Sequence, residues 1–280
     1  MYRIVKKEAL KPTVILYEIE APMVARKAEP GQFIILRVDE NGERIPITIH
    51  DYDREKGTVT IIVQTVGATT EKLSHKQEGD SLHDFVGPLG RPTETEGKKK
   101  VCVVGGGVGC AIAYPVLKKF HDCGAEVHAV VGFKSKDVVI LEDKFRAVSS
   151  VMKICTDDGS YGQKGLVTEA LKELLDAGTV YDEIFAIGPM VMMKFVSKPT
   201  EPYGVPTTVS MSPIMIDGTG MCGGCRLSVG GETKFACVDG PDFDGHKVDW
   251  DVAVKRNQMY RDFEMHKHEE VCNLYKQEVK

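Results

Sequence analysis

The chain has 280 residues, more than one small hydrophobic core usually organises, and this length predicts about two domains. Its 36 basic and 41 acidic residues leave a net charge of −5, which excludes an electrostatic basis for binding nucleic acid or an anionic membrane. No apolar run approaches the roughly 18 residues of a membrane span, and the first residues lack the apolar core of a secretion signal, so we expect a cytoplasmic protein.

The first third of the chain is rich in short β-branched runs bounded by glycine-containing turns. The predicted strands are residues 14–20, 32–38 and 58–64. Several short strands at this spacing predict a small antiparallel barrel, which we place at residues 1–98. The polar and charged stretch 91–100 is expected to link it to the next domain.

From residue 99 the pattern changes to strands that alternate with helices. The predicted strands are residues 100–104, 126–132, 151–155 and 183–188, with helices ending near residue 120 and spanning 166–175. This alternation predicts a doubly wound parallel sheet, an α/β domain over residues 99–210. We expect a loop domain rich in glycine and cysteine at 211–245 and a charged helical tail at 246–280.

The loop domain contains four candidate metal ligands. Asp217, Cys222, Cys225 and Cys237 are separated by four, two and eleven residues. This is the plant-type [2Fe–2S] spacing with aspartate in the first position. A structural zinc site normally has two C-x2-C pairs, and only one is present, so zinc is the weaker alternative. The second alternative is that these cysteines are structural and bind no metal.

Glycines fill most of the gaps between these ligands, at positions 218, 220, 223 and 224. A loop that surrounds an inorganic cluster needs positive-φ positions, which glycine adopts at no steric cost. For Asp217 the alternative role is that of a turn-forming residue, with another ligand completing the cluster. The remaining cysteines lack ligand spacing and are expected to be mostly buried or unreactive: Cys102, Cys110, Cys123, Cys155 and Cys272.

A glycine-rich loop follows the first strand of the α/β domain. Its glycines are Gly105, Gly106, Gly107 and Gly109, and Cys110 stands where the third glycine of G-x-G-x-x-G would fall. Between a strand and a helix, such a loop lets the backbone approach a pyrophosphate at the helix N-terminus. The sequence therefore predicts a nucleotide site, with a tight structural turn as the alternative.

Two further segments follow strands of the same sheet. Asp158 comes after the third strand, and Gly188 and Pro189 end the fourth. Ligands of doubly wound folds bind at the carboxyl ends of the strands, so we predict that all three line the nucleotide site; ordinary surface turns are the alternative. Lys134 and Lys136 follow the second strand and could meet a 2′-phosphate, or be solvated.

The tail contains His266 and His268. Residues two apart do not share a helix face, so these two histidines are expected to be solvated side chains on the surface rather than a metal site.

A barrel, a nucleotide-binding domain and a [2Fe–2S] loop together resemble the ferredoxin-reductase-like flavoproteins. Residues 44–48, 67–70 and 87–90 are similar to that family's flavin motifs. The resemblance implies that Arg44 pairs with flavin phosphates, that Pro46 and Ile47 contact the flavin, and that Thr48 lies at its reactive edge as the catalytic residue. By the same resemblance, the pyrophosphate is bound by Gly67, Thr69 and Thr70. Taken without these motifs, Arg44 could equally be a solvated side chain at the edge of a strand.

Within this family the whole chain resembles two groups. One comprises electron-transfer subunits of type B dihydroorotate dehydrogenase, and the other small subunits of NADH-dependent ferredoxin:NADP oxidoreductase, the bifurcating transhydrogenase also known as sulfide dehydrogenase beta subunit. Asp217 and the segment 240–251 with its tail are more similar to the second group. Ile187 stands where many members of the superfamily have a cysteine, so no thiol is expected beside the nicotinamide.

The resemblance implies an electron-transfer subunit with NAD(H), FAD and a [2Fe–2S] cluster as cofactors. It also implies a larger partner subunit that carries a second FAD, [4Fe–4S] clusters and an NADPH site, and that delivers electrons to ferredoxin. The preference for NAD over NADP as the nicotinamide cofactor is inferred from the resemblance. Three alternatives stay open: a dihydroorotate dehydrogenase subunit, a non-catalytic iron–sulfur carrier, and a zinc-stabilised nucleotide-binding module.

Overall fold

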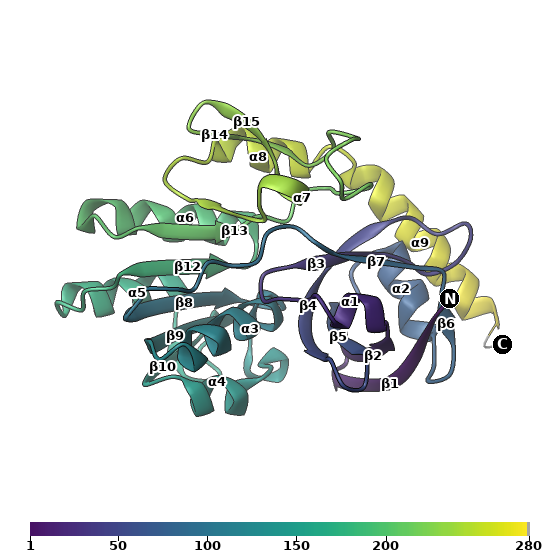
Figure 1. Cartoon of the computed structure of the whole chain (residues 1–280), viewed down its shortest axis with the longest axis horizontal. Helices are drawn as coiled ribbons and strands as arrows, with labels where there is room; N and C mark the ends of the chain where they lie inside the picture. The colour runs from purple at the N-terminus through teal and green to yellow at the C-terminus, as the bar shows by residue number, and fades with distance from the viewer. Residues whose placement is uncertain (279–280) are drawn as a thin grey trace.

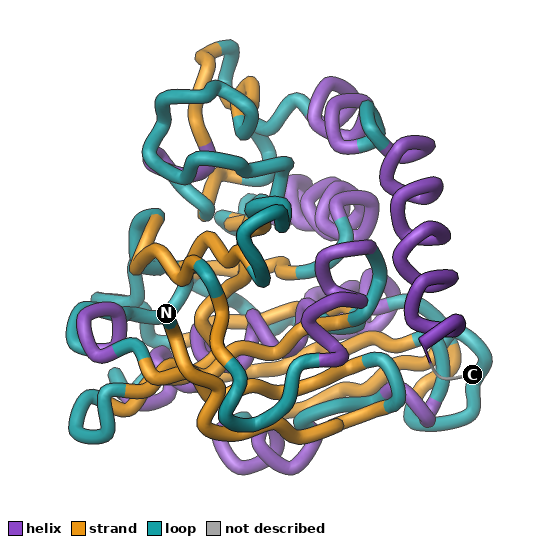
Figure 2. The backbone as a smooth tube through the Cα atoms, turned by 90° about the vertical axis from the view of Figure 1, so that its right-hand side faces the viewer, coloured by secondary structure: helices purple, strands orange, loops and turns teal. Residues whose placement is uncertain are grey.

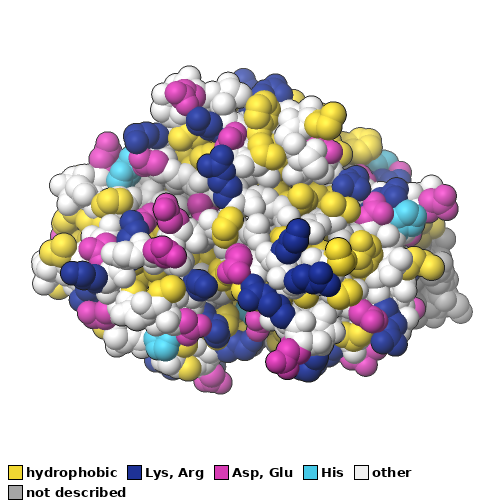
Figure 3. Space-filling model, in the orientation of Figure 1, with side chains coloured by type: hydrophobic (Ala, Val, Ile, Leu, Met, Phe, Trp, Pro, Cys, Tyr) yellow, Lys and Arg dark blue, Asp and Glu magenta, His cyan; other side chains and the backbone are white. Residues whose placement is uncertain are grey.

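The computed structural model describes the backbone of residues 1–278 and shows a barrel beside an α/β domain, with a smaller region across them (Figure 1). A helix at the C-terminal end of the described chain runs along the barrel. Basic and acidic side chains are interspersed over the face in Figure 3, as the small net charge implies. Among the described residues, no helix has both the length and the apolar character needed to cross a bilayer.

The barrel is a seven-stranded antiparallel sheet with the order β6-β1-β2-β5-β4-β3-β7. Its elements are β1 (Tyr2–Lys11), β2 (Val14–Glu20), α1 (Pro22–Ala25), β3 (Phe33–Arg37), β4 (Ile45–Asp53), β5 (Thr58–Gln64), α2 (Ala68–His75), β6 (Ser81–Leu82) and β7 (Asp84–Leu89). The three predicted strands are confirmed as β2, β3 and β5. Alternate residues of these strands fill one apolar core around Tyr17, Ile34 and Phe85. The predicted barrel is therefore confirmed.

The α/β domain is a second seven-stranded sheet, of order β11-β10-β9-β8-β12-β13-β16. Its strands are β8 (Lys100–Gly106), β9 (Glu126–Phe133), β10 (Val151–Thr156), β11 (Gln163–Lys164), β12 (Glu183–Ile187), β13 (Thr207–Ser210) and β16 (Asp242–Asp244). Its helices are α3 (Gly109–Asp122), η1 (Lys136–Val138), α4 (Glu142–Val148), α5 (Val167–Asp176), α6 (Met190–Thr200) and η2 (Glu201–Tyr203). All pairs are parallel except β13 with β16.

Helices cover both faces of this sheet because its strands are apolar on both sides. Val101 and Val103 of β8 pack with α3 and α4, around Phe120. Cys102 and Val104, which point to the opposite face, pack with α5 and α6. The doubly wound architecture is thus confirmed.

The smaller region consists of the β14 (Arg226–Val229) and β15 (Glu232–Phe235) hairpin, α7 (Ala236–Asp239), α8 (Trp250–Asn257) and α9 (Arg261–Glu278). Its buried residues Cys225, Leu227 and Trp250 belong to the same apolar cluster as the α5–α6 face of the sheet. The tail is two helices rather than one, and α9 is the long helix at the right of Figure 2.

Two connections differ from a simple succession of domains. β16, from the segment assigned to the loop domain at 211–245, pairs with β13 of the α/β sheet. The stretch 91–100 is fixed in place, because the Arg91 N–H donates to the Gly240 carbonyl at 2.7 Å and the Thr93 hydroxyl to Asp242 at 2.6 Å. The domain boundaries stay predictions, and Phe33 and Ile35 of the barrel share an apolar cluster with the α/β sheet and the smaller region.

Candidate functional site

The structure places three candidate cluster ligands in the loop before β14, and the β14–β15 hairpin returns the chain so that Cys237, on α7, lies next to Cys225. The sulfur atoms of Cys225 and Cys237 are 3.2 Å apart, and both residues are buried. Cys222 is exposed. Burial and the neighbouring Cys225 raise the pKa of the Cys237 thiol to about 12. Two closely spaced thiols in an apolar setting are a donor pair for a soft metal, which would take them as thiolates.

Asp217 and Cys222 form the polar side of the same loop. One carboxylate oxygen of Asp217 accepts hydrogen bonds from the Thr219 hydroxyl at 2.5 Å, the Thr219 N–H at 2.9 Å and the Met221 N–H at 3.3 Å. These donors lower the pKa of Asp217, the Thr219 hydroxyl most strongly. The Gly224 N–H is the main cause of the lowered pKa of Cys222. In both groups the lowered pKa favours the ionised form that ligation requires.

The loop has the positive-φ glycines expected of it: φ is +85° at Gly218, +86° at Gly220 and +66° at Gly223. A Cβ on Gly218 would lie 2.7 Å from the Leu89 side chain, so this glycine lets the loop lie directly on the barrel. From the other side, Arg256 of α8 donates to the Gly224 carbonyl at 3.1 Å. The loop is held between the barrel and the tail.

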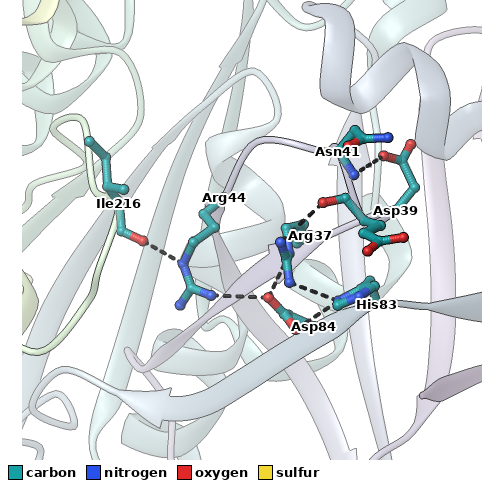
Figure 4. A network of polar contacts seen from close by, with 8 residues as sticks. Arg37, Asp39, Asn41, Arg44, His83, Asp84 and Ile216 are labelled. Carbon is teal, nitrogen blue, oxygen red and sulfur yellow. Dashed lines mark hydrogen bonds and ion pairs between the residues drawn. The ribbon is translucent and has the colours of Figure 1, made fainter.

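Arg44 connects the barrel to this loop (Figure 4). Its Nε donates to the Ile216 carbonyl at 2.8 Å, and its Nη1 lies 3.1 Å from Asp84. Arg37 also pairs with Asp84, at 2.7 Å. The guanidinium is half-buried and faces the residue before Asp217. Contact between Arg44 and flavin phosphates stays a prediction, whereas its link to the cluster loop was not foreseen.

The predicted flavin residues of β4 line a pocket between the barrel and the α/β domain. Pro46, Ile47 and Thr48 contribute to it from the barrel, and Thr70 from the start of α2. Residues at the start of α3 form the opposite wall. The pocket has a volume of about 290 Å³. Both predicted nucleotide-binding units therefore meet at one place, as electron exchange between their ligands requires.

His50, also in this pocket, was missed by the sequence analysis. It lies on β4, is 3% exposed, and its Nδ1 donates to the Ala111 carbonyl of α3 at 2.7 Å. Burial lowers the pKa of the imidazole, which is therefore neutral, with a lone pair on Nε2. Nε2 is buried and has no hydrogen-bond partner in the described structure. The one sequence signal for a role of His50 is its position two residues after Thr48, because alternate residues of a strand face the same side.

The predicted pyrophosphate loop precedes α2. The Thr70 hydroxyl accepts hydrogen bonds from the N–H groups of Val66 and Gly67, each at 3.0 Å, and Thr69 donates to Glu43 at 3.3 Å. The two threonines thus shape the loop. Their contact with a pyrophosphate stays a prediction.

The glycine loop after β8 packs closely on the loop after β12. A Cβ on Gly109 would lie 2.7 Å from both Gly188 Cα and the Ile187 carbonyl oxygen, and one on Gly106 would lie 3.2 Å from Pro189. Only Gly107 faces open space, with φ at +55°. A Cβ on Gly105 would lie 2.9 Å from the Cys110 sulfur. The structure thus places all six predicted residues of the two loops together at the carboxyl edge of the sheet, and close packing explains three of the glycines.

Asp158 lies at the same edge but is turned toward its own loop. Its carboxylate accepts from the Ser160 N–H at 2.9 Å and from the Ser160 hydroxyl at 2.6 Å. The Ser160 hydroxyl in turn accepts from the Lys136 N–H at 2.8 Å, which joins the loops after β9 and β10. Lys134 and Lys136 are both exposed there. A direct role of Asp158 in binding nucleotide stays a prediction.

Comparisons with known proteins place this geometry in a family. Residues 212–249 match the model of the iron–sulfur cluster binding domain of dihydroorotate dehydrogenase B. A Thermotoga maritima homolog of the dihydroorotate dehydrogenase B (NAD(+)) electron transfer subunit is 47% identical over 261 residues, covering 93% of this chain and 92% of the relative. The chain belongs to this family of electron-transfer subunits and their homologues.

Two other similarities cover nearly the whole chain. An uncharacterized protein of Clostridium beijerinckii is 53% identical over 93% of this chain and 91% of its own length. A solved chain of an NADH-dependent reduced ferredoxin–NADP oxidoreductase, described in connection with flavin-based electron bifurcation, superposes with a TM-score of 0.91 at 45% identity, over 96% and 97% of the two chains. The comparisons confirm the family resemblance and an oxidoreductase subunit, and they support the predicted FAD, NAD(H) and iron–sulfur cofactors.

Proposed function

We propose that this chain is the NADH-dependent electron-transfer subunit of a ferredoxin:NADP oxidoreductase of the bifurcating type. The observation that carries the proposal is the link from Arg44 to the Ile216 carbonyl at 2.8 Å, which connects the flavin-motif strand to the residue before Asp217. The pocket lined by Thr48 and the start of α3 supplies the proposed nucleotide site beside the same strand. The strand β4 therefore adjoins both the proposed nucleotide pocket and, through Arg44, the loop with the proposed cluster ligands.

When bound, FAD supplies the conversion between the two-electron hydride chemistry of NAD(H) and the one-electron chemistry of a [2Fe–2S] cluster. Thr48 and His50 both line a pocket whose remaining lining is largely apolar, and Nε2 of His50 is buried without a partner among the described residues. The Thr48 hydroxyl would hydrogen-bond at the reactive edge of the ring system, while the apolar neighbours exclude water. Gly107 and the N-terminus of α3 offer backbone to a dinucleotide.

Asp217, Cys222, Cys225 and Cys237 are the proposed cluster ligands. They combine the donor pair of buried thiols with an ionised carboxylate and a thiol of lowered pKa. A carboxylate is a harder donor than a thiolate, so it changes the charge and the reduction potential of the site. A zinc site is disfavoured because the donors follow the plant-type spacing and the matching domain model is an iron–sulfur one.

We further propose that a larger subunit binds beside Cys222. It would carry a second FAD, [4Fe–4S] clusters and the NADPH site, and pass electrons to ferredoxin. Apolar side chains are exposed around this cysteine: Ile216 and Tyr260 by about half, Met259 by 58% and Met221 by 87%. With Arg256 of α8, most of them border a pocket of about 300 Å³. Exposed apolar groups at a rim of this kind mark protein interfaces.

A second candidate is the electron-transfer subunit of dihydroorotate dehydrogenase itself, which the match of residues 212–249 favours. The test is an anaerobic preparation of the chain with its co-expressed partner. Flavin and iron–sulfur absorption that is bleached by NADH, followed by NADPH- and ferredoxin-linked turnover, is the expected result. Turnover with dihydroorotate would establish the second candidate, and a colourless protein after reconstitution with iron, sulfide and FAD would overturn both.

A further inference from the structure

Helix α9 packs against α2 and brings together side chains that are far apart in the sequence. Glu71 of α2 meets His268 and Cys272 of α9, and one ligand atom from each residue lies within 4.8 Å of the other two. All three side chains are half-buried. A carboxylate, an imidazole and a thiol thus converge at one point between the helices, well away from Cys222, Cys225 and Cys237 in the sequence.

The pairing on α9 follows from helical geometry. His268 and Cys272 are four residues apart, so they share one face of the helix, whereas His266 points elsewhere and lies 3.4 Å from Glu270. The expectation that His266 and His268 do not act as a pair is consistent with this arrangement. What the sequence did not reveal is that His268 has a different partner four residues later.

The His268 ring lacks a hydrogen bond that would account for its position. Its Nε2 is buried and has no hydrogen-bond partner in the described part of the chain, although the ring is only half-buried. The nearest carboxylate oxygen belongs to Glu71, at 3.8 Å, too far for a hydrogen bond. A buried ring nitrogen costs free energy unless it is paired, and a metal ion between the two atoms would pair it.

A second histidine holds the Glu71 carboxylate in its orientation. Its other carboxylate oxygen lies 3.3 Å from Nε2 of His75, one turn further along α2. The His75 ring is stacked on Tyr275 of α9, with ring centroids 3.7 Å apart. Carboxylates that bind metals are commonly held in this way by a second hydrogen-bonding group.

We propose that Glu71, His268 and Cys272 bind a zinc-class divalent cation, with water at the fourth position. Mixed oxygen, nitrogen and sulfur donors suit Zn²⁺ and disfavour Mg²⁺ and Ca²⁺, which take oxygen ligands. The ion would fasten α9 to α2. Since α2 begins directly after Gly67, the site would also stabilise the predicted pyrophosphate loop.

The test uses the full chain with its iron–sulfur cluster assembled, depleted of loosely bound metal and then dialysed against Zn²⁺. We expect one zinc per chain in addition to the iron, with X-ray absorption at the zinc edge showing a single sulfur among nitrogen and oxygen neighbours. No bound zinc, or a zinc shell of several sulfurs typical of a misloaded cluster site, would overturn the proposal.

Variants separate the two metal sites. Cys272→Ser and His268→Gln should each weaken zinc binding at least about tenfold while iron and sulfide stay unchanged, and Cys237→Ser should lose iron but keep the zinc. Cys123→Ser removes an exposed thiol elsewhere and is the matched control. His75→Phe keeps an aromatic ring for Tyr275 but not the Glu71 contact, and should weaken zinc binding by roughly 10- to 100-fold. Unaltered zinc affinity in both His268→Gln and Cys272→Ser would refute the site.

Discussion

The Nε of Arg44 donates a hydrogen bond to the backbone carbonyl of Ile216 at 2.8 Å, across 172 positions of the sequence. Arg44 immediately precedes β4, the strand with the flavin motif, and Ile216 immediately precedes the first proposed cluster ligand. The same guanidinium is also paired with Asp84 of the barrel. Its charged N–H groups therefore connect the loop that contains Ile216 to the barrel. The strand with the flavin motif and the loop with the proposed cluster ligands are therefore joined through the Arg44 side chain.

Replacing Arg44 by lysine should loosen this connection. Lysine keeps the charge but cannot contact Asp84 and the Ile216 carbonyl with a planar fork. Loss of a hydrogen bond from a charged donor costs about 1.5–3 kcal/mol, so Arg44→Lys should lose iron to a chelator about tenfold faster and should retain less FAD. Iron release followed by its absorbance, with flavin content measured on the same sample, checks the expectation.

Arg37→Lys is the matched control, because Arg37 also pairs with Asp84 but makes no contact with Ile216. It should release iron at the wild-type rate. Equal acceleration in both variants would show that the Asp84 ion pairs, and not the bond to the loop, hold the cluster.

The sequence predicted the strands with mostly apolar or β-branched runs and missed β1 and β4. β8 and β9 are mostly apolar, whereas β1 interleaves an arginine, three lysines and one glutamate with its apolar residues and begins at the second residue. β4 begins with Ile45-Pro46, and proline removes a strand donor, so its strand signal is weak. Tertiary pairing places these two strands in the sheet, and no local pattern indicates it.

The site residues also fall into a group that the sequence predicts and a group that it does not. Ligand spacing within one loop, as for Cys222 and Cys225, is legible in the sequence because the chain itself sets the distance. The partners of Arg44 and the meeting of Glu71 with Cys272 depend on packing between remote elements. Such contacts leave no spacing in the sequence by which they could be recognised.

Asp217→Cys should lower the reduction potential of the cluster. Thiolate donates more electron density than carboxylate, and the three hydrogen bonds that Asp217 accepts withdraw density from the site. We expect a shift on the order of tens of millivolts, or more. Thr219→Val removes one of these donors at similar volume and should cause a smaller shift in the same direction. Potentiometric titration followed by electron paramagnetic resonance measures both; an unchanged potential in Asp217→Cys would exclude Asp217 as a ligand.

Gly109→Ala should impair NADH use. The new Cβ would lie 2.7 Å from Gly188 Cα and from the Ile187 carbonyl oxygen, so the loops after β8 and β12 must separate. Overpacking of this kind costs about 1–3 kcal/mol, and the KM for NADH in dye reduction should rise about tenfold. Gly124→Ala, at the other end of α3, meets no neighbouring atom, although its φ of +85° makes it strained. Its KM should stay unchanged; a similar rise in both variants would point to general destabilisation.

Asp242→Asn should stabilise the protein at alkaline pH. Asp242 lies on β16 and accepts a hydrogen bond from Thr93 at 2.6 Å, and burial raises the pKa of its carboxyl to about 6. Above that pH the folded protein contains a poorly solvated carboxylate that the unfolded chain would solvate fully. Asparagine removes the charge, and its side-chain oxygen can still accept from Thr93. We expect the variant to gain on the order of 1 kcal/mol at pH 8.

The sign of the pH dependence tests this explanation. Because the carboxyl of Asp242 has a raised pKa when folded, the native state binds the proton more tightly, and the wild type gains stability as the pH falls from about 6 toward 4. The advantage of Asp242→Asn should therefore be largest at pH 8 and should shrink on acidification, as measured by melting temperatures at pH 8 and pH 5.5. Asp244→Asn, which removes a carboxylate paired with Lys247 on the same strand, should show no such gain at pH 8. An advantage of Asp242→Asn that grew on acidification would mean that Asp242 is stabilised as a carboxylate, contrary to its burial.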